Sequence, residues 1–341
     1  ALNHLEARCR LRAFMKLAVA ALVLLTGLLT ASAQSASSKL ERTHLFGIDY
    51  VRLADWAKAY HFQMFWTRRN EEVQLTNSWS KLVFTADSHK AEINGVAVFL
   101  SAPVAVRNSS VFVSVMDLET AVQPALFPPK NTVSVPILNV CLDPGHGGKD
   151  PGNEVGRRKE KEYTLLLARE VREELTGAGL KVTLTRNGDS YVPLPDRPAL
   201  AKQRAADLFV SLHFNAAITE KDQIEGVEVY CLTPAGADST NARGDSADTS
   251  ACAGNRFDAK NMLLAYQVQK AMIRNLPVED RGVKRARFAV LREARVPAVL
   301  IEAGFMSHPR ESKRIFDPQY RRQLGRAIAE GILAYKRLVE R

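Results

Sequence analysis

Cysteine is scarce in this chain, and its scarcity excludes the small domains that depend on disulfide bonds. Only four cysteines occur among 341 residues, and three of them, Cys141, Cys231 and Cys252, lie beyond residue 33. Three cysteines do not form a disulfide framework. Cys141 lies in an apolar run and reads as a small buried residue. We hypothesise that Cys231 and Cys252 pair in an oxidising compartment.

A long apolar run is also missing. Residues 17–29 form an apolar run that is shorter than the ~20 residues a membrane-spanning helix needs. Basic residues precede this run, and Ala31, Ser32 and Ala33 provide the small side chains of a cleavage site. We therefore predict a secretory signal peptide over residues 1–33, in which residues 1–14 are an upstream extension if Met15 is the start. The mature protein is expected in the periplasm or cell envelope, without a stable membrane anchor.

Acidic residues are fewer than basic ones. The formal net charge is +10, and removal of residues 1–33 takes away four basic residues and one acid, which leaves +7. A basic exported protein is suited to an anionic polymer such as cell wall, or to a lipid surface. The sequence has no block of basic residues interleaved with aromatic ones. Together with the export signal, this absence argues against nucleic acid as a partner.

Proline is concentrated where a domain boundary would lie. Four prolines fall within residues 124–136, a run that we predict to be neither helix nor central strand and assign as a linker. Residues 40–123 before it alternate short apolar runs with turn signals such as Asn94-Gly95, which favours a small α+β domain. Residues 137–341 after it are expected to form the catalytic domain.

The small domain resembles the N-terminal domain of copper amine oxidases. The resemblance lies in Ile93-Asn-Gly-Val-Ala-Val and in Val111-Phe-Val-Ser-Val-Met-Asp-Leu. It brings no copper site with it, because His61 and His89 lie far apart on unlike elements. The domain is expected to be a stalk, or alternatively a module that binds the wall or a partner.

The second domain alternates strand and helix patterns, which predicts a three-layer α/β/α fold around a mostly parallel sheet. Helices are expected at residues 162–175, 195–206, 260–276 and 318–341, and strands at residues 140–142, 180–186, 208–212, 226–232 and 297–304.

Three of these strands end in residues that can bind metal or move protons. His146 follows the first strand on a glycine-flanked loop, His213 follows the run at residues 208–212, and Glu302 ends the run near residue 297. A phosphate-binding loop is excluded at His146, because no Ser or Thr follows Lys149 and Asp150 replaces the last glycine of a dinucleotide fingerprint. The carboxyl ends of parallel strands share one sheet edge, so these side chains are expected to converge.

Two histidines and one carboxylate, with a fourth position left to water, form the ligand set of a catalytic zinc site. Glu160, just before the helix at residue 162, provides a second carboxylate. We assign His146, Glu160 and His213 as zinc ligands and Glu302 as the general base. The pattern alone also permits the reverse, with Glu302 on the metal and Glu160 as base.

Six sequence blocks within residues 138–338 resemble the zinc-dependent N-acetylmuramoyl-L-alanine amidases. They are Asp143-Pro-Gly-His-Gly-Gly-Lys-Asp-Pro-Gly, Glu160-Lys-Glu, Thr185-Arg with Asp189 and Arg197, Phe209-Val-Ser-Leu-His-Phe-Asn-Ala216, Arg281-Gly-Val-Lys284, and Val299-Leu-Ile-Glu-Ala-Gly-Phe-Met-Ser-His-Pro309. The chain departs from the family pattern at Lys202 and His308.

The resemblance implies that His146, Glu160 and His213 bind one Zn²⁺ and that Glu302 is the catalytic residue. The implied substrate is peptidoglycan, cut between N-acetylmuramic acid and the L-alanine of the stem peptide. Asn215 and Arg292 are candidate substrate contacts. Arg186, Asp189 and Arg197 are expected to form a structural ion-pair network instead, because buried charges are normally paired.

Three alternatives remain at this point. Residues 233–261 are polar and lack a helical apolar period, which favours a surface insertion. Some amidases carry an inhibitory helix there, which a protein activator withdraws from the zinc site. The domain could instead be a zinc peptidase or deacetylase, or a wall-binding protein with a relic site.

Overall fold

The computed structural model describes residues 40–131, 136–240 and 249–340. The predicted signal peptide lies outside these residues, as does part of the polar segment that follows residue 232. Among the helices within the described ranges, none combines the length and the apolar character needed to cross a membrane.

The larger part of the chain is built on six strands of one sheet. Their order is β13 (Lys181–Leu184), β10 (Asn139–Pro144), β14 (Leu208–Asn215), β17 (Ala298–Phe305), β15 (Val227–Leu232) and β16 (Asp280–Ala286). Neighbouring strands are parallel except β15 and β17, which are antiparallel. The prediction of a mostly parallel sheet is confirmed.

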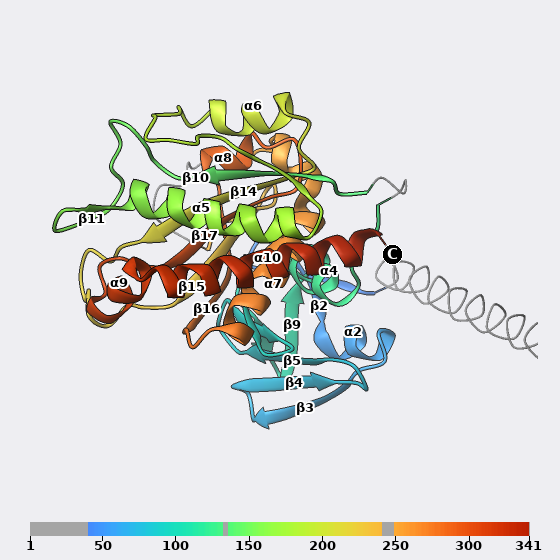
Figure 1. Cartoon of the computed structure of the whole chain (residues 1–341). Helices are drawn as coiled ribbons and strands as arrows, with labels where there is room; N and C mark the ends of the chain where they lie inside the picture. The colour runs from blue at the N-terminus through green and yellow to red at the C-terminus, as the bar shows by residue number, and fades with distance from the viewer. Residues whose placement is uncertain (1–39, 132–135, 241–248, 341) are drawn as a thin grey trace, which may run out of the picture.

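Helices cover both faces of this sheet, as the three-layer prediction requires (Figure 1). Val140 and Leu142 of β10 pack into the core that also holds Leu167 and Val171 from a helix, whereas Cys141 joins a second core on the other face. The first face carries α5 (Glu160–Gly177), α7 (Asp258–Asn275) and α10 (Pro318–Glu340); the second carries α6 (Asp196–Gln203) and α8 (Ala289–Arg292). Because the side chains of a strand alternate between faces, one apolar run supplies both cores.

Several elements of this part were not predicted. The strand β16 is charged at four of its seven positions, which hides its alternation. The helix α9 (Pro309–Phe316) begins with proline at a position where the missing N–H is tolerated, and the His308 ring accepts a hydrogen bond from the Glu311 backbone N–H. His308 therefore acts as a helix cap. The short helix η2 (Ala253–Phe257) lies in the segment that we expected to lack helix.

The N-terminal part has the α+β character that was predicted. Its strands are β1 (Arg42–Leu45), β2 (Ile48–Arg52), β3 (Gln63–Arg68), β4 (Glu72–Thr76), β5 (Lys81–Thr85), β6 (Lys90–Ile93), β7 (Val96–Phe99), β8 (Ala105–Arg107) and β9 (Ser110–Ser114). Its helices are α2 (Leu53–Ala59), α3 (Val115–Asp117), η1 (Leu118–Val122) and α4 (Gln123–Leu126). Asn94 and Gly95 both have positive φ angles, 50° and 80°, as the predicted hairpin turn between β6 and β7 requires.

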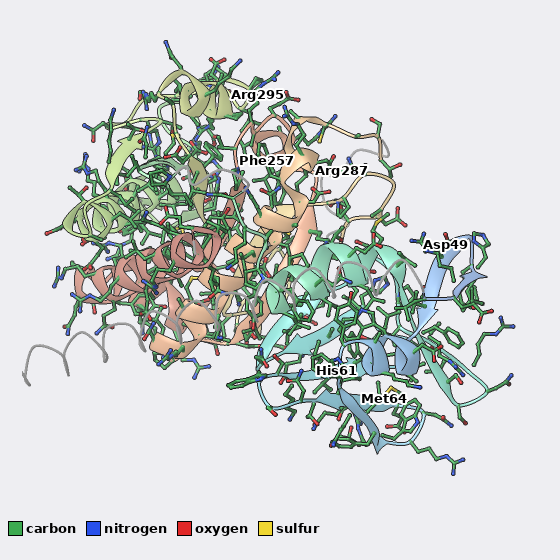
Figure 2. All side chains as sticks on the ribbon, turned by 90° about the vertical axis from the view of Figure 1, so that its right-hand side faces the viewer. Asp49, His61, Met64, Phe257, Arg287 and Arg295 are labelled. Carbon is green, nitrogen blue, oxygen red and sulfur yellow. The ribbon has the colours of Figure 1, made fainter. Side chains whose placement is uncertain are left out.

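The two parts share one sheet. Strand β7 pairs in parallel with β16 through Val98 and Val283, so β7-β6-β5-β4-β3 extend the six-stranded sheet to eleven strands. Figure 1 shows the small strands directly below β15 and β16. Seen from the side in Figure 2, the part that carries His61 and Met64 packs against the part that carries Arg287. The small domain therefore covers an edge strand of the larger one.

The predicted linker is shorter than residues 124–136. Helix α4 extends to Leu126, because Pro124 occupies its first turn, where proline removes no intrahelical hydrogen bond. The expectation that no helix forms in this run is wrong at its start.

A buried ion pair joins the two parts. The Arg285 guanidinium lies 2.9 Å from the Asp117 carboxylate, and the two side chains are only 1% and 0% exposed. Arg285 also donates hydrogen bonds to the hydroxyls of Ser101 and Thr120. A buried charge is tolerated only when such partners surround it. Their geometry therefore fixes the small domain in one position.

The hypothesis of a Cys231–Cys252 disulfide is wrong. All three cysteines of the described residues are free thiols. The Cys231 thiol faces the Lys284 carbonyl oxygen at 3.6 Å, and the Cys252 thiol lies 3.2 Å from the Asn255 side-chain oxygen. The two sulfur atoms therefore contact different partners. Strand β15 carries Cys231 into the sheet core.

We predict that Asp117→Asn lowers the free energy of unfolding by about 3–5 kcal/mol, because it leaves Arg285 buried without its counter-charge. Denaturant titration with linear extrapolation measures this change. The matched control is Asp55→Asn, which breaks an exposed pair with Arg52 and is expected to change stability by less than about 1 kcal/mol. A loss at Asp117 no larger than the control would contradict the role of the pair.

Candidate active site

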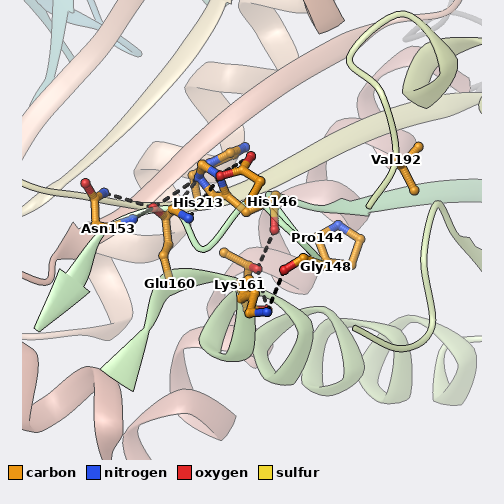
Figure 3. A network of polar contacts seen from close by, with 12 residues as sticks. Pro144, His146, Gly148, Asn153, Glu160, Lys161, Val192 and His213 are labelled. Carbon is orange, nitrogen blue, oxygen red and sulfur yellow. Dashed lines mark hydrogen bonds and ion pairs between the residues drawn. The ribbon is translucent and has the colours of Figure 1, made fainter. Parts of the chain in front are cut away.

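The predicted residues meet at one edge of the sheet. Strand β10 ends at Pro144 and places His146 on the following turn, and β14 carries His213 near its end. Glu302 on β17 is the register partner of His213. Glu160 begins α5 and directs its side chain back toward both histidines (Figure 3). The convergence that the sequence predicted is therefore present.

His146 is held in an unusual backbone conformation. Its φ angle is 60°, in the left-handed region that residues other than glycine rarely adopt. The Arg197 guanidinium donates to the His146 carbonyl oxygen at 2.9 Å, and the Asp150 carboxylate accepts from the imidazole Nδ1 at 2.9 Å. Such strain persists only where the surroundings fix it, and it is typical of functional positions. The Nδ1–Asp150 contact leaves Nε2 as the free ligand atom.

Two glycines of the motif make room for this arrangement. A Cβ atom at Gly145 would lie 2.2 Å from the His213 ring. A Cβ atom at Gly152, where φ is +67°, would lie 2.6 Å from the His146 ring and 2.7 Å from the Glu160 carboxylate. All three distances are shorter than real Cβ contacts allow. Glycine is therefore required at both positions for the ring and carboxylate to pack as they do.

Glu160 is the centre of the cluster. Its side chain is only 1% exposed, and one carboxylate oxygen accepts from the Phe214 backbone N–H at 3.0 Å while facing His213 Nδ1 at 3.1 Å. The other oxygen accepts from the Asn153 backbone and side chain at 2.9 Å and lies 3.1 Å from His146 Nε2. Every lone pair direction of this carboxylate is thus directed at a donor or at an imidazole nitrogen.

The three side chains form a group that could hold a metal ion. One ligand atom from each of His146, Glu160 and His213 lies within 4.8 Å of the others. The two imidazole rings meet edge to face, with centroids 4.9 Å apart. The histidine side chains are 22% and 19% exposed, so solvent reaches the group from one side. The geometry therefore combines a buried carboxylate with a wet face.

Burial and charge act in opposite directions on this group. Burial raises the pKa of Glu160, but hydrogen bonds from His146 and His213 outweigh it and leave that pKa below the ordinary value. Burial likewise lowers the pKa of His146, yet Glu160 and Asp150 together raise it above the ordinary value. The carboxylate charge is therefore the strongest electrostatic feature of the group, as expected of residues that attract a cation.

Glu302 lies beside the group but is not part of it. Its Oε2 atom is buried and has no hydrogen-bond partner among the residues that the structure describes. Burial, reinforced by the negative charges of Glu160 and Glu228, raises the pKa of Glu302 well above its ordinary value, and Lys284 opposes this shift. A buried carboxyl group without a partner is a candidate for proton transfer.

Glu228 faces Glu302 across β15 and β17. Its carboxylate accepts hydrogen bonds from Asn215 and Tyr230 at 2.9 and 2.8 Å, and it pairs with Lys284 and Arg281. With two cations and two further donors, Glu228 is fully engaged. By contrast, the Oε2 atom of Glu302 has no hydrogen-bond partner among the described residues.

Arg186, Asp189 and Arg197 do not pair with one another as predicted, but each has a structural partner. Arg197 forms a buried ion pair with Asp143 at 2.9 Å. Arg186 donates to the backbone carbonyl oxygens of Pro144 and Gly145. Asp189 pairs with Lys161 at 2.7 Å instead of with either arginine. These contacts hold the loop that carries His146.

The two predicted substrate contacts are not brought together. Asn215 lies at the site edge, but its side chain bonds to Glu228 and to the Ala216 backbone N–H. β15 and β16 run antiparallel to β17, so β16 ends at the opposite edge of the sheet. Helix α8 follows that end, and Arg292 is its last residue. Figure 2 labels Arg287 and Arg295, which lie on either side of this helix in the sequence.

The described ends of the polar insertion also lie at that opposite edge. The Arg287 guanidinium donates to the carbonyl oxygens of Pro234 and Thr249, and the Thr240 backbone N–H donates to the Arg285 carbonyl oxygen. Residues 241–248, part of the segment in which an inhibitory helix was considered, lie outside the described residues. The residues flanking them give that alternative no support.

Sequence reasoning missed Asp150, Asn153, Glu228 and Lys284. Asp150 is four residues after His146 in the quoted motif, a spacing at which a second carboxylate could have been suspected. Glu228 is the single acid in the apolar strand β15, which is a signal for a buried functional charge. Lys284 ends one of the quoted blocks but was given no role, and Asn153 reaches the site through contacts with Glu160 and Phe214 that the sequence does not signal.

Comparisons with known proteins agree with this site. Residues 140–334 match the family model described as N-acetylmuramoyl-L-alanine amidase, and residues 47–125 match that of the copper amine oxidase N-terminal domain. The amidase AmiA of Escherichia coli is 36% identical over 222 residues, which cover 58% of this chain and 75% of that protein. The amidase AmiC of Neisseria meningitidis is 35% identical over 220 residues, 58% of this chain and 52% of that protein.

A solved structure is similar as well. The N-acetylmuramoyl-L-alanine amidase AmiC2 of Nostoc punctiforme is 32% identical, with a TM-score of 0.49, and covers 58% of this chain and 96% of its own. The family model covers more than half of this chain and includes all four residues proposed for the chemistry. The protein therefore belongs to the N-acetylmuramoyl-L-alanine amidases, which are peptidoglycan hydrolases.

Proposed function

We propose that the protein is an exported zinc amidase in which His146, Glu160 and His213 bind the metal and Glu302 transfers the proton. The observation that carries this proposal is the meeting of three ligand atoms within 4.8 Å beside a carboxyl group whose buried Oε2 atom has no hydrogen-bond partner. The substrate is peptidoglycan, at the amide between N-acetylmuramic acid and the first alanine of the stem peptide.

The residues fit one zinc ion. Two imidazole nitrogens and one carboxylate are the donor set of catalytic zinc sites. Asp150 accepts from His146 Nδ1 and so orients the ring with Nε2 toward the ligand group. The Phe214 backbone N–H and Asn153 orient Glu160 in the same way. A bound zinc ion would polarise the amide carbonyl and lower the pKa of a water molecule.

Glu302 supplies the proton transfer. The register pairing of Glu302 with His213 places this residue beside the ligand group. In the ionised form it takes a proton from the attacking water, and in the protonated form it returns that proton to the departing amine of alanine. Burial of the carboxyl group, which raises its pKa, favours the second of these steps. Glu228 and Lys284 hold each other beside it and keep the local charge balanced.

The first prediction separates ligand from base. His213→Ala is expected to lose bound zinc and activity together, whereas Glu302→Gln keeps about one zinc per chain and loses about 10²- to 10⁴-fold in kcat. Metal analysis and a peptidoglycan digestion assay measure the two quantities. Loss of zinc from Glu302→Gln would reverse the assignment of ligand and base.

The second prediction concerns the carboxylate behind His146. Asp150→Asn is expected to weaken zinc binding by about 10- to 100-fold, because the ring loses the acceptor that fixes its orientation. Competition against a chromophoric chelator measures the affinity. Glu154→Gln, which changes an exposed acid on β11 (Glu154–Val155), is the matched control. Equal affinities for the two variants would rule out this role of Asp150.

The third prediction identifies the bond. Digestion of intact sacculi is expected to release stem peptides with a free N-terminal alanine, separable by chromatography and identified by mass. A zinc peptidase would instead release peptides cut between amino acids, and a deacetylase would release acetate. Either of those products would contradict the amidase assignment.

A further inference from the structure

The extended sheet has one open face. In β4, the side chains of Val73 and Leu75 are buried, whereas Gln74 and Thr76 are partly exposed. The same alternation occurs in β5 and β6, and in β3 Phe65 is 46% exposed. The core therefore lies on one side of the small domain, and the other side is accessible to solvent.

This open face is the face that carries the active site. Glu302 pairs in register with Glu228, and Tyr230, two residues further along β15, pairs with Lys284. Val283 pairs with Val98, so the next residues, Lys284 and Phe99, lie on the opposite face together. The Lys284 ammonium is 5.6 Å from the centroid of the Phe99 ring.

The row of Tyr230 and Lys284 pairs with Leu300, two residues from Glu302 along β17, and continues onto the small domain. Phe99 is the register partner of Lys90 on β6, and both side chains are accessible to solvent. Three strand spacings separate β17 from β7, a distance of about 14 Å. Adjacent strands rotate by about 20–25° relative to one another. Side chains on the strands closest to β16 therefore point most nearly in the same direction as those of the site. Phe99 and Lys90 meet that condition, whereas Phe65 lies four strands beyond β7.

The substrate is a polymer, and only one of its bonds lies at Glu302. Its sugar rings have apolar faces that pack on aromatic rings, and its stem peptides carry carboxylates that attract ammonium groups. A partly exposed phenylalanine beside an exposed lysine offers both kinds of contact. The continuity of this row with the active site identifies the occupant as the uncleaved polymer.

We propose that Phe99 and Lys90 of the small domain form a secondary substrate-binding surface that holds the peptidoglycan strand beyond the reacting amide. This proposal rests on the proposed function. It assigns the small domain a direct role in substrate selection, because the ion pair of Arg285 and Asp117 fixes that surface relative to Glu302.

The test compares two substrates. Phe99→Ala and Lys90→Ala are expected to lower kcat/KM on polymeric, uncrosslinked glycan strands by about three- to tenfold each, with kcat/KM on a single soluble muropeptide unchanged. Phe65→Ala, on the last strand of the sheet and on the same face, is the matched control and is expected to change neither value. Thermal unfolding checks that each variant is folded.

Equal loss on both substrates, or no loss on either, would overturn the proposal. Lys90→Ala decides the outcome if Phe99→Ala fails to fold, because Lys90 is exposed and packs into no core. Failure of the unaltered protein to cut either substrate would refute the proposed function instead, so the two failures are distinguishable.

Discussion

The site depends on one buried carboxylate between two imidazole rings. Glu160 is withdrawn from water at the start of α5, and its negative charge is compatible with burial only because donors surround it. The strained backbone of His146 and the glycines at 145 and 152 all serve this close approach. A cation shared by the three side chains would balance the charge that the fold has concentrated there. Arg197 and Arg186 do not take part in the chemistry. They donate to backbone carbonyl oxygens and so hold the loop that carries His146.

A second constraint joins the small domain to the catalytic one. The parallel pairing of β7 with β16 and the buried Arg285–Asp117 pair make the two parts one body. A domain attached only through a proline-rich segment would sample many orientations. Here the covered edge strand lies two strands from Glu302. The continuous sheet therefore joins two regions of the chain that match two separate family models.

Much of the site could be predicted, because its residues follow apolar runs that end in turn formers. His146, His213 and Glu302 were located in this way, and the strands that position them were found at residues 139–144, 208–215 and 298–305. Local patterns carry no information on strand direction, however. Arg292 was therefore named as a candidate substrate contact although its helix follows the end of β16 at the opposite edge, and the pairing of β7 with the charged strand β16 was not foreseen. The linker was predicted to start too early for a related reason. A proline in the first turn is compatible with a helix, so Pro124 did not exclude α4.

The central claim is that distant segments of one chain gather around a single divalent ion. Crystals of the purified protein, measured on both sides of the zinc absorption edge, test it most directly. The account predicts one anomalous peak within bonding distance of His146 Nε2, His213 Nδ1 and a Glu160 carboxylate oxygen, about 2.0–2.2 Å from each. A zinc-saturated crystal with no peak there, or with its peak on other residues, would contradict it.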